Sequence, residues 1–211
     1  MTDRSTLDAS LAAGIQTLGL DVAAAARARL LDYLELLVRW NATYNLTAVR
    51  EPAQMVPRHL LDSLAIAPYV HGQTIADLGT GAGLPGIPLA IVAPQRRVLL
   101  VEANGKKARF LREAARRMSL DNVEIVQARA EGADCAAPLD CVVARALAPL
   151  PELARLAARW LAPAGELLAM KGPGWEDERI GLPAGWSVLA SHRITVPGLD
   201  AGRFLVVLRQ S

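Results

Sequence analysis

The chain has 211 residues, of which 52% are hydrophobic and 21% charged, and its formal net charge is +2 at pH 7. This composition supports a sizeable buried core, and the charge is well short of that of a protein that coats nucleic acid. The sequence has no run of about 18 uncharged apolar residues and no apolar N-terminal stretch followed by a cleavage site. We therefore expect neither a membrane-spanning helix nor a secretory signal, and we expect a cytoplasmic protein.

The first third of the chain has helical patterns. Residues 7–18, 21–40 and about 51–70 are read as helical, and Asp21 is a plausible N-cap of the second segment. Gly72 closes the region, which predicts a helical extension over residues 1–72. One face of the second segment carries five apolar side chains: Leu30, Leu31, Leu34, Leu37 and Val38.

From residue 73 the pattern changes to short apolar runs that are typical of strands. The first five are separated by helix-length segments, as in βαβ units with a parallel sheet, and the last two are separated by a turn-rich segment, as in an antiparallel hairpin. This order predicts a Rossmann-like α/β domain over residues 73–211, and its ending favours a class I methyltransferase sheet over a plain dinucleotide-binding one. The seven runs are 74–79, 97–103, 123–128, 139–146, 165–172, 186–196 and 203–211.

A glycine-rich loop directly follows the first of these strands. It begins at Asp77 and contains Gly79, Gly81, Gly83 and Gly86, which allow positive φ and the close approach of a ligand. The loop fits two motifs, the GxGxxG of dinucleotide sites over 81–86 and an acidic residue followed by GxGxG over 77–83. A carboxylate at Asp77 would repel a pyrophosphate, whereas S-adenosylmethionine carries an ammonium and a sulfonium and no phosphate. We therefore expect S-adenosylmethionine, with contacts at Asp77, Gly79, Gly81 and Gly83.

Two further positions suit an adenosine group. Glu102 ends the second strand, where a carboxylate can accept hydrogen bonds from both ribose hydroxyls, although a solvated loop carboxylate is the alternative. Ala130 and Glu131 follow the third strand, at the usual place for contacts to the adenine ring. These features support an adenosine ligand without separating the two cofactor classes.

Cationic residues gather between residues 96 and 117, where few acids occur. The stretch is either the solvated face of a helix or a patch that faces phosphates. Cys135 and Cys141 match no CxxC or zinc spacing, so we expect reduced packing residues and no metal site. The cationic residues are Arg96, Arg97, Lys106, Lys107, Arg109, Arg112, Arg116 and Arg117.

An ordered set of motifs resembles the small-subunit ribosomal RNA guanine-N7 methyltransferases, a family formerly named glucose-inhibited division protein B. The motifs are Trp40-Asn41, Asn45-Leu46-Thr47, Arg58-His59-Leu60-Leu61-Asp62-Ser63-Leu64, the glycine loop continued to Leu89, Gly105-Lys106-Lys107-Ala108-Arg109-Phe110-Leu111, Arg145-Ala146 and Lys171-Gly172.

The resemblance implies methylation of N7 of a guanine, numbered 527 in the family's name, in 16S rRNA of the small ribosomal subunit. It also implies cofactor contacts at Gly79, Leu84, Ala130, Glu131 and Arg145. The residues after the second strand, Glu102-Ala103-Asn104, depart mildly from relatives, so only Glu102 is given a role.

The chemistry of this target makes a modest demand on the protein. Guanine N7 has a lone pair and no proton, so attack on the methyl group needs positioning and no general base. After the fourth strand the chain has Val143-Ala144-Arg145-Ala146-Leu147 and lacks the Asn/Asp-Pro-Pro-aromatic motif of amino-group methyltransferases. It also has no Pro-Cys or Thr-Cys pair to supply the covalent nucleophile that cytosine C5 methylation uses. We expect no catalytic acid or base, and Arg145, His59 and Lys171 are positioning candidates.

Alternatives remain open at several of these residues. His59 lies three residues before Asp62, within reach on one helical face, so the two form either a polar pair or part of a segment that covers the cofactor and orients RNA. Lys171 either reverses the chain or contacts an rRNA phosphate. As a whole, the chain could also be a nicotinamide or flavin oxidoreductase, or a non-catalytic ribosome-assembly factor. The candidate RNA-binding residues are Arg58, Lys106, Lys107, Arg109, Arg112, Arg116 and Lys171.

Overall fold

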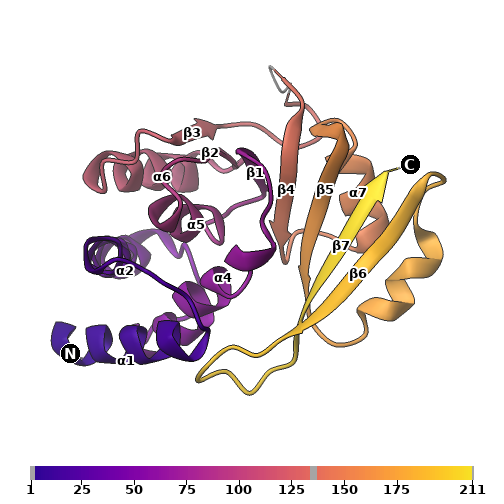
Figure 1. Cartoon of the computed structure of the whole chain (residues 1–211). Coiled ribbons are helices and arrows are strands. Elements are labelled where there is room, and N and C mark those ends of the chain that lie inside the picture. Colours follow the sequence, from indigo (N-terminus) through magenta and orange to yellow (C-terminus); the bar gives the residue numbers. More distant parts are fainter. Residues whose placement is uncertain (1–2, 134–136, 211) are drawn as a thin grey trace.

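A computed structural model describes residues 3–133 and 137–210, so Cys135 lies outside the described residues. In this part of the chain, helices pack on both faces of one seven-stranded sheet (Figure 1). Cys141 is free and buried on the fourth strand, as expected of a packing residue, and burial raises the pKa of its thiol.

The N-terminal region is helical, as predicted, but its details differ. Helix α2 begins at Ala24 and follows Ala23, so Asp21 is not its N-cap and that prediction was wrong. The segment around residues 51–70 is broken, with a π-helical stretch that contains Pro57, a residue that cannot donate a backbone hydrogen bond. The elements are α1 (Arg4–Thr17), α2 (Ala24–Tyr44), α3 (Pro52–Met55), η1 (Val56–Leu61), α4 (Asp62–Leu64) and η2 (Ala67–Tyr69).

The sheet has the predicted mixed topology. Its order is β3-β2-β1-β4-β5-β7-β6, and β7 runs antiparallel to both β5 and β6, so the last two strands form the expected hairpin. No helix occurs between β3 and β4 in residues 127–133 and 137–138, contrary to the predicted alternation. The strands are β1 (Thr74–Leu78), β2 (Arg97–Val101), β3 (Val123–Val126), β4 (Leu139–Arg145), β5 (Leu161–Lys171), β6 (Trp186–Ile194) and β7 (Arg203–Gln210).

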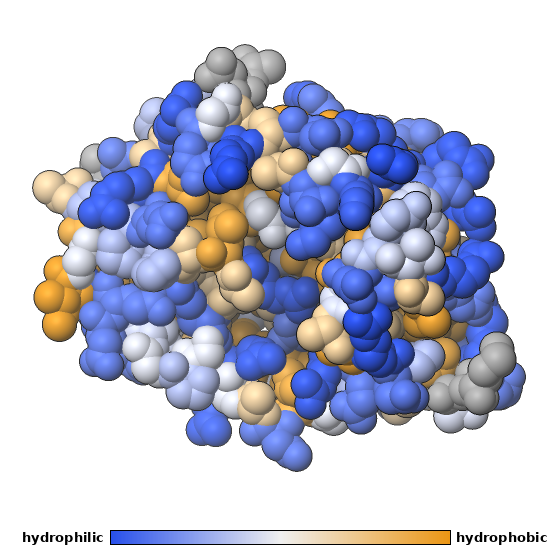
Figure 2. All heavy atoms as spheres, turned by 180° about the vertical axis from the view of Figure 1, so that it is seen from behind, coloured by the Kyte–Doolittle hydropathy of each residue, from blue (hydrophilic) through white to orange (hydrophobic). Residues whose placement is uncertain are grey.

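The two faces of the sheet have different covers. The N-terminal helices, α5 (Gly86–Val92) and α6 (Gly105–Arg117) pack on one face, and α7 (Leu150–Ala157) and the 3-10 helix η3 (Trp175–Gly181) pack on the other. Alternate side chains of each strand enter the two cores, because successive residues of a strand point to opposite faces. From behind, the surface is mostly hydrophilic, with hydrophobic residues in small groups (Figure 2).

The helical extension and the sheet share a core. The fully buried side chains of α2, among them Tyr33 and Leu37, belong to the same cluster as Ile75 of β1 and Leu100 of β2. Folding of residues 1–72 thus removes apolar surface of the sheet from water. The helical elements end at Tyr69 and β1 begins at Thr74, and a domain boundary at residue 72 stays a prediction.

The strand order reverses between β1 and β4, which pair in parallel with Asp77 opposite Val143. The chain leaves β1 through α5 on one face and leaves β4 through α7 on the other. Open α/β sheets bind ligands outside the carboxyl ends of their strands at such a reversal. The candidate site is therefore expected beyond Leu78 and Arg145.

Candidate functional site

Two cavities lie at the strand reversal and share Gly79 and Ala146 as part of their walls. The larger, of about 500 Å³, is also lined by Leu46, Thr47, Val49, Arg58, His59, Asp62, Thr80, Gly81, Ala82, Leu84, Arg145, Met170, Lys171, Gly172 and Arg203. The smaller, of about 350 Å³, is also lined by Val101, Glu102, Ala103, Lys107, Ala128, Arg129, Ala130, Glu131, Leu147, Glu152 and Leu156.

The loop glycines serve different purposes. Gly79, Gly81 and Gly83 have φ of 65°, 62° and 91°, in the region that favours glycine. A Cβ at Gly83 would lie 2.8 Å from the Ile87 side chain, so packing alone requires this glycine. A Cβ at Gly81 would meet nothing closer than 3.9 Å. Gly81 is therefore the glycine whose missing side chain leaves space beside the cavity.

Asp77 is completely buried below the loop. Its Oδ2 accepts hydrogen bonds from Thr80 Oγ1 at 2.6 Å and from the Gly86 amide at 2.8 Å, so one carboxylate fixes both ends of the loop. Its Oδ1 has no hydrogen-bond partner among the described residues. Burial raises the pKa of Asp77 to about 6, against the hydrogen bonds and Arg145, which favour the ionised form. Asp77 lines neither cavity, so in this structure it holds the loop, and its contact with the donor stays a prediction.

Glu102 is a buried loop anchor, not a solvated carboxylate. Its Oε2 accepts a hydrogen bond from the Gly81 amide at 2.9 Å, and its Oε1 accepts one from the Asn104 amide at 2.8 Å. Each oxygen keeps a further acceptor site, which can serve a ribose hydroxyl in the smaller cavity. Ala130 and Glu131 line the same cavity, so the three predicted adenosine contacts are brought together.

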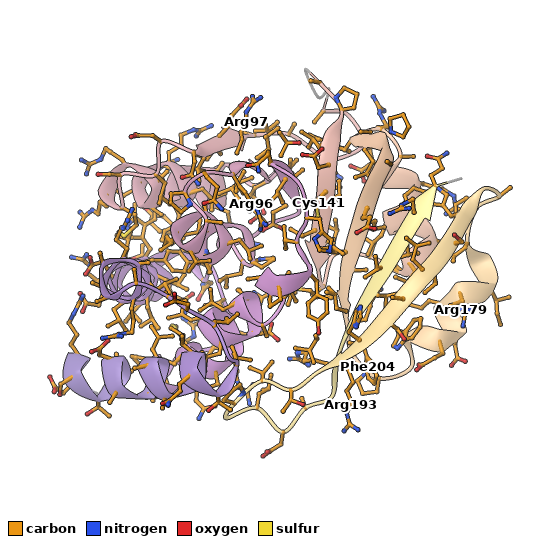
Figure 3. All side chains as sticks on the ribbon, viewed as in Figure 1. Arg96, Arg97, Cys141, Arg179, Arg193 and Phe204 are labelled. Atoms are coloured by element: carbon orange, nitrogen blue, oxygen red, sulfur yellow. The ribbon has the colours of Figure 1, made fainter. Side chains whose placement is uncertain are left out.

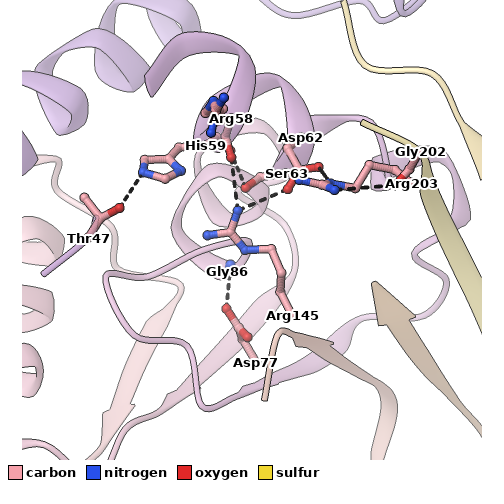
Figure 4. Close-up of polar contacts among 10 residues, drawn as sticks. All are labelled: Thr47, Arg58, His59, Asp62, Ser63, Asp77, Gly86, Arg145, Gly202 and Arg203. Atoms are coloured by element: carbon pink, nitrogen blue, oxygen red, sulfur yellow. Dashed lines mark hydrogen bonds and ion pairs between the residues drawn. The ribbon is translucent and has the colours of Figure 1, made fainter. Parts of the chain in front are cut away.

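Asp62 holds two arginines at the larger cavity. Its Oδ2 lies 3.1 Å from Nη1 of Arg145 at the end of β4, and its Oδ1 lies 3.1 Å from Nε of Arg203 at the start of β7 (Figure 4). Arg145 also donates to the Arg58 carbonyl at 3.2 Å. The carboxylate, only 3% exposed, thus connects the helical extension to two strands that are not neighbours.

The suggested pairing of His59 with Asp62 is wrong. His59 Nε2 lies 2.9 Å from Thr47 Oγ1, whereas Asp62 faces Arg145 and Arg203. The spacing of three residues suits an α-helix, but the chain here is π-helical up to Leu61, which changes the side-chain directions. Burial lowers the pKa of His59, so its neutral form is favoured.

Lys171 lines the larger cavity, but its ammonium is occupied. Nζ lies 2.6 Å from Glu178 of η3 and donates to the Ala148 carbonyl at 2.8 Å. This geometry corresponds to the chain-reversal role expected as one alternative. A contact with an rRNA phosphate stays a prediction, and it would have to compete with Glu178.

The basic stretch between residues 96 and 117 is not one patch. Arg96 and Arg97 lie at the amino end of β2, away from the cavities. Figure 3 shows them far from Arg193 and Phe204, which lie at the other end of the strands. Helix α6 carries the rest along its length, about 15 Å from Lys106 to Arg116. Of the candidate RNA-binding residues on α6, Lys107 alone lines one of the two cavities described above, and Arg116 pairs with Glu113 at 3.0 Å. The others are Lys106, Arg109 and Arg112.

Three residues support the site without a role predicted from the sequence. The buried Tyr33 hydroxyl of α2 donates to the Ala82 carbonyl of the glycine loop at 2.7 Å. Asn41 Oδ1 accepts from the Thr47 amide at 2.9 Å and so holds the segment beside the larger cavity. Arg203 is the third. Asn41 stood in a motif that could have indicated it, whereas Tyr33 and Arg203 had no such signal.

Comparisons with known proteins agree on one family. Residues 26–206 match the family model described as rRNA small subunit methyltransferase G. The ribosomal RNA small subunit methyltransferase G of Xanthomonas euvesicatoria pv. vesicatoria (strain 85-10) is 55% identical over 204 residues, 97% of this chain and 95% of that protein.

Solved structures share the fold at low sequence identity. A SAM-dependent methyltransferase from Aquifex aeolicus has a TM-score of 0.59 and 18% identity over 78% of this chain and 96% of its own. The glycopeptide N-methyltransferase MtfA complexed with S-adenosyl-L-homocysteine has a TM-score of 0.62 and 13% identity, over 72% and 87%. Within residues 3–133 and 137–210, no helix is long and apolar enough to cross a membrane, and no cluster of three metal-ligating side chains occurs.

Proposed function

Since the chain belongs to the rRNA small subunit methyltransferase G family, we propose that it transfers a methyl group from S-adenosylmethionine to N7 of a guanine in 16S rRNA. The proposal includes recognition of that rRNA within the small ribosomal subunit and a cytoplasmic location. The observation that carries it is the pair of cavities that adjoin at Gly79 and Ala146, because the donor's methyl group and the target base must come into direct contact where their two sites adjoin.

The residues present fit the cofactor. Glu102, Ala130 and Glu131 would hold the adenosine part in the smaller cavity, and the backbone beside Gly81 would face the methionine part. Asp77 would act from beneath the loop, by holding Thr80 and Gly86 in place and by favouring the donor's ammonium through its charge. When bound, S-adenosylmethionine supplies a methyl group on a positively charged sulfur, which makes that carbon electrophilic.

The larger cavity would bind the guanine, and its main requirement is to position N7 against the methyl carbon. N7 attacks the methyl carbon with its own lone pair, the bond from carbon to sulfur breaks, and no proton has to leave. The lowered pKa of His59 and its hydrogen bond to Thr47 suit a fixed neutral wall of the cavity. Leu84 and Arg145, for which the resemblance implies contacts with the donor, line this larger cavity, and those contacts are part of the proposal.

The competing functions are weaker. Membership of a methyltransferase family excludes the nicotinamide or flavin oxidoreductase, so the GxGxxG interpretation of residues 81–86 was wrong. An inactive assembly factor would keep the fold without needing an open loop at Gly81. The intact loop and the buried Glu102 favour an active enzyme.

The direct test uses purified small subunits, S-adenosylmethionine and the wild-type protein. Mass spectrometry of the 16S rRNA should find one methyl group on guanine N7, and subunits from cells without the gene should accept it. Single-turnover rates with both substrates saturating should vary little between about pH 6 and 9, because N7 begins unprotonated. Methylation of an amino group or of cytosine C5, or a rate that follows one enzyme pKa, would contradict the proposal.

A further inference from the structure

The larger cavity has an excess of positive charge at its wall. Among its described lining residues, Asp62 is the sole acid, and it faces two of the three arginines. The third, Arg58, has an exposed side chain. A guanine base is neutral, so this excess is not explained by the base itself.

The two arginines that Asp62 holds keep donors for a ligand. Arg203 uses Nε for Asp62 and Nη1 for the Gly202 carbonyl at 3.5 Å, and Nη2 has no hydrogen-bond partner in the described part of the chain. Arg145 uses Nη1 alone, for Asp62 and for the Arg58 carbonyl. Both guanidinium groups therefore remain able to donate to an anion in the cavity.

Arg145 and Arg203 differ in how exposed their side chains are. The Arg145 side chain is 22% exposed and lies close enough to Asp77 to influence its titration, which places it at the donor side. The Arg203 side chain is 32% exposed, begins β7, and follows the exposed residues Asp200 and Ala201. Arg203 is thus at the rim, where an RNA backbone would pass while its base enters the cavity.

Asp62 fixes the position of Arg203. An exposed arginine samples many rotamers, and a buried carboxylate that accepts from its Nε selects one of them. The same carboxylate accepts from Arg145 through its other oxygen, so the two guanidinium groups are held on either side of it (Figure 4). The arrangement presents fixed donors to an anion at the rim.

We propose that Arg203 contacts a phosphate group of the rRNA next to the target guanine, and that Asp62 is the positioning residue that holds Arg203 for it. This inference rests on the proposed function, because it names the part of the RNA substrate that the rim recognises. Phosphate contacts fix the register of a nucleic acid on a protein without reading its sequence. Arg203 would therefore set where the RNA lies.

The test compares Arg203→Gln with Arg209→Gln. Both arginines are on β7 and pair with a carboxylate, but Arg209 pairs with Glu166 at 2.6 Å and lines neither cavity. For Arg203→Gln we expect KM for small subunits to rise about tenfold and the slope of log affinity against log salt to fall by about 0.7 to 0.9, the value of one phosphate contact. Affinity for S-adenosylhomocysteine, measured by calorimetry, should stay within about twofold. Arg209→Gln should change none of these values.

Asp62→Asn tests the positioning role while keeping the shape of the side chain. Its KM for subunits should rise as in Arg203→Gln, and the double variant should be no worse than the more affected single variant, because both remove one contact. Thermal unfolding of every variant identifies any loss of folded protein. An additive double variant with the single-variant KM changes present would overturn the positioning role.

Two results would overturn the phosphate contact. Weaker S-adenosylhomocysteine binding by Arg203→Gln, with subunit affinity unchanged, would show that Arg203 binds the donor's carboxylate. An unchanged salt slope and subunit affinity would show that the rim does not meet RNA. Subunit binding is measured by filter retention without methyl transfer, so a wild-type protein that binds subunits but methylates another atom would refute the proposed function and leave this inference standing.

Discussion

The two cavities share a wall and differ in charge. The larger is lined by Arg58, Arg145, Lys171 and Arg203 against a single acid, Asp62. The smaller is lined by three acids, Glu102, Glu131 and Glu152, against Lys107 and Arg129. The smaller cavity has the groups that suit the donor's ribose and adenine, and the basic lining of the larger suits a polyanion, so we propose that the RNA approaches the donor's methyl group from the larger cavity. The predictions below test that separation.

Gly81→Val should have the largest effect. A β-branched residue at φ 62° is strained, and its side chain would enter the space that we assign to the donor. We expect S-adenosylhomocysteine affinity to fall by more than about 200-fold, which is more than about 3 kcal/mol and so exceeds the cost of backbone strain alone. Gly185→Val is the matched control, because Gly185 has φ 81° and open space away from both cavities. Equal losses of affinity in the two variants, or unchanged affinity in a folded Gly81→Val, would place the donor elsewhere.

Glu102→Ala should weaken the donor by about 1.5 to 3 kcal/mol, the scale for hydrogen bonds to a charged group. Because Glu102 also fixes the Gly81 and Asn104 amides, part of this loss comes from the loop. A donor analogue without the 2′ and 3′ hydroxyls separates the two parts. The wild type should lose more affinity than the variant when the hydroxyls are removed, and equal losses would show that Glu102 only holds the loop.

The ionisation of Asp77 should tune donor affinity by about tenfold between pH 5 and 7, because a pKa of about 6 takes the carboxylate from mostly protonated to mostly ionised. Affinity should rise with pH, since the donor's ammonium favours the ionised form. Stability follows the opposite sign: the folded pKa lies above the ordinary 3.8, so this contribution is complete below pH 3.8 and is lost as the pH rises through about 6. Asp77→Asn should flatten the affinity profile measured by calorimetry. A profile of the same slope in the variant would assign the dependence to another group.

Tyr33→Phe should have the smallest effect. It removes one buried hydrogen bond to the Ala82 carbonyl, which costs about 1 kcal/mol of stability and, through the loop, about two- to fivefold in donor affinity. Tyr44→Phe on the same helix is the control, since the Tyr44 hydroxyl has no hydrogen-bond partner within the described residues. Urea unfolding and calorimetry on both variants decide whether α2 supports the loop, and identical behaviour would show that it does not.

The fold could be predicted because its signals are local. Apolar runs, a glycine loop after the first strand and a turn-rich segment before the last indicate the sheet, its direction changes and the position of the cofactor loop. The caps and breaks of the helices could not be predicted in the same way. Ala23 precedes α2 without a side-chain cap, and the π-helical turn around Pro57 packs against α1, which is distant in sequence.

The strand-end and loop residues of the candidate site could be predicted from the sequence, whereas the ion-pair partners of its charged side chains could not. Asp77 lies next to the end of β1, the loop glycines follow that strand and Glu102 follows β2, so their meeting is a consequence of the topology. The partners of Asp62 come from residues 83 and 141 positions away in sequence, and no local spacing indicates them. His59 was matched with Asp62 because they are near neighbours in the chain, whereas the structure gives each a more distant partner.

The place of β7 in the sheet bears on how the protein is made. Strand β7 lies between β5 and β6 and pairs with both. During synthesis neither of these strands can form its pairing with β7 until residues 203–210 have left the ribosome. The parallel half and the glycine loop can form before that moment, but Arg203 arrives with the last strand. Arg203 is thus the last arginine of the larger cavity to be synthesised, and a chain that stops before residue 203 would carry the glycine loop without the arginine proposed to meet RNA.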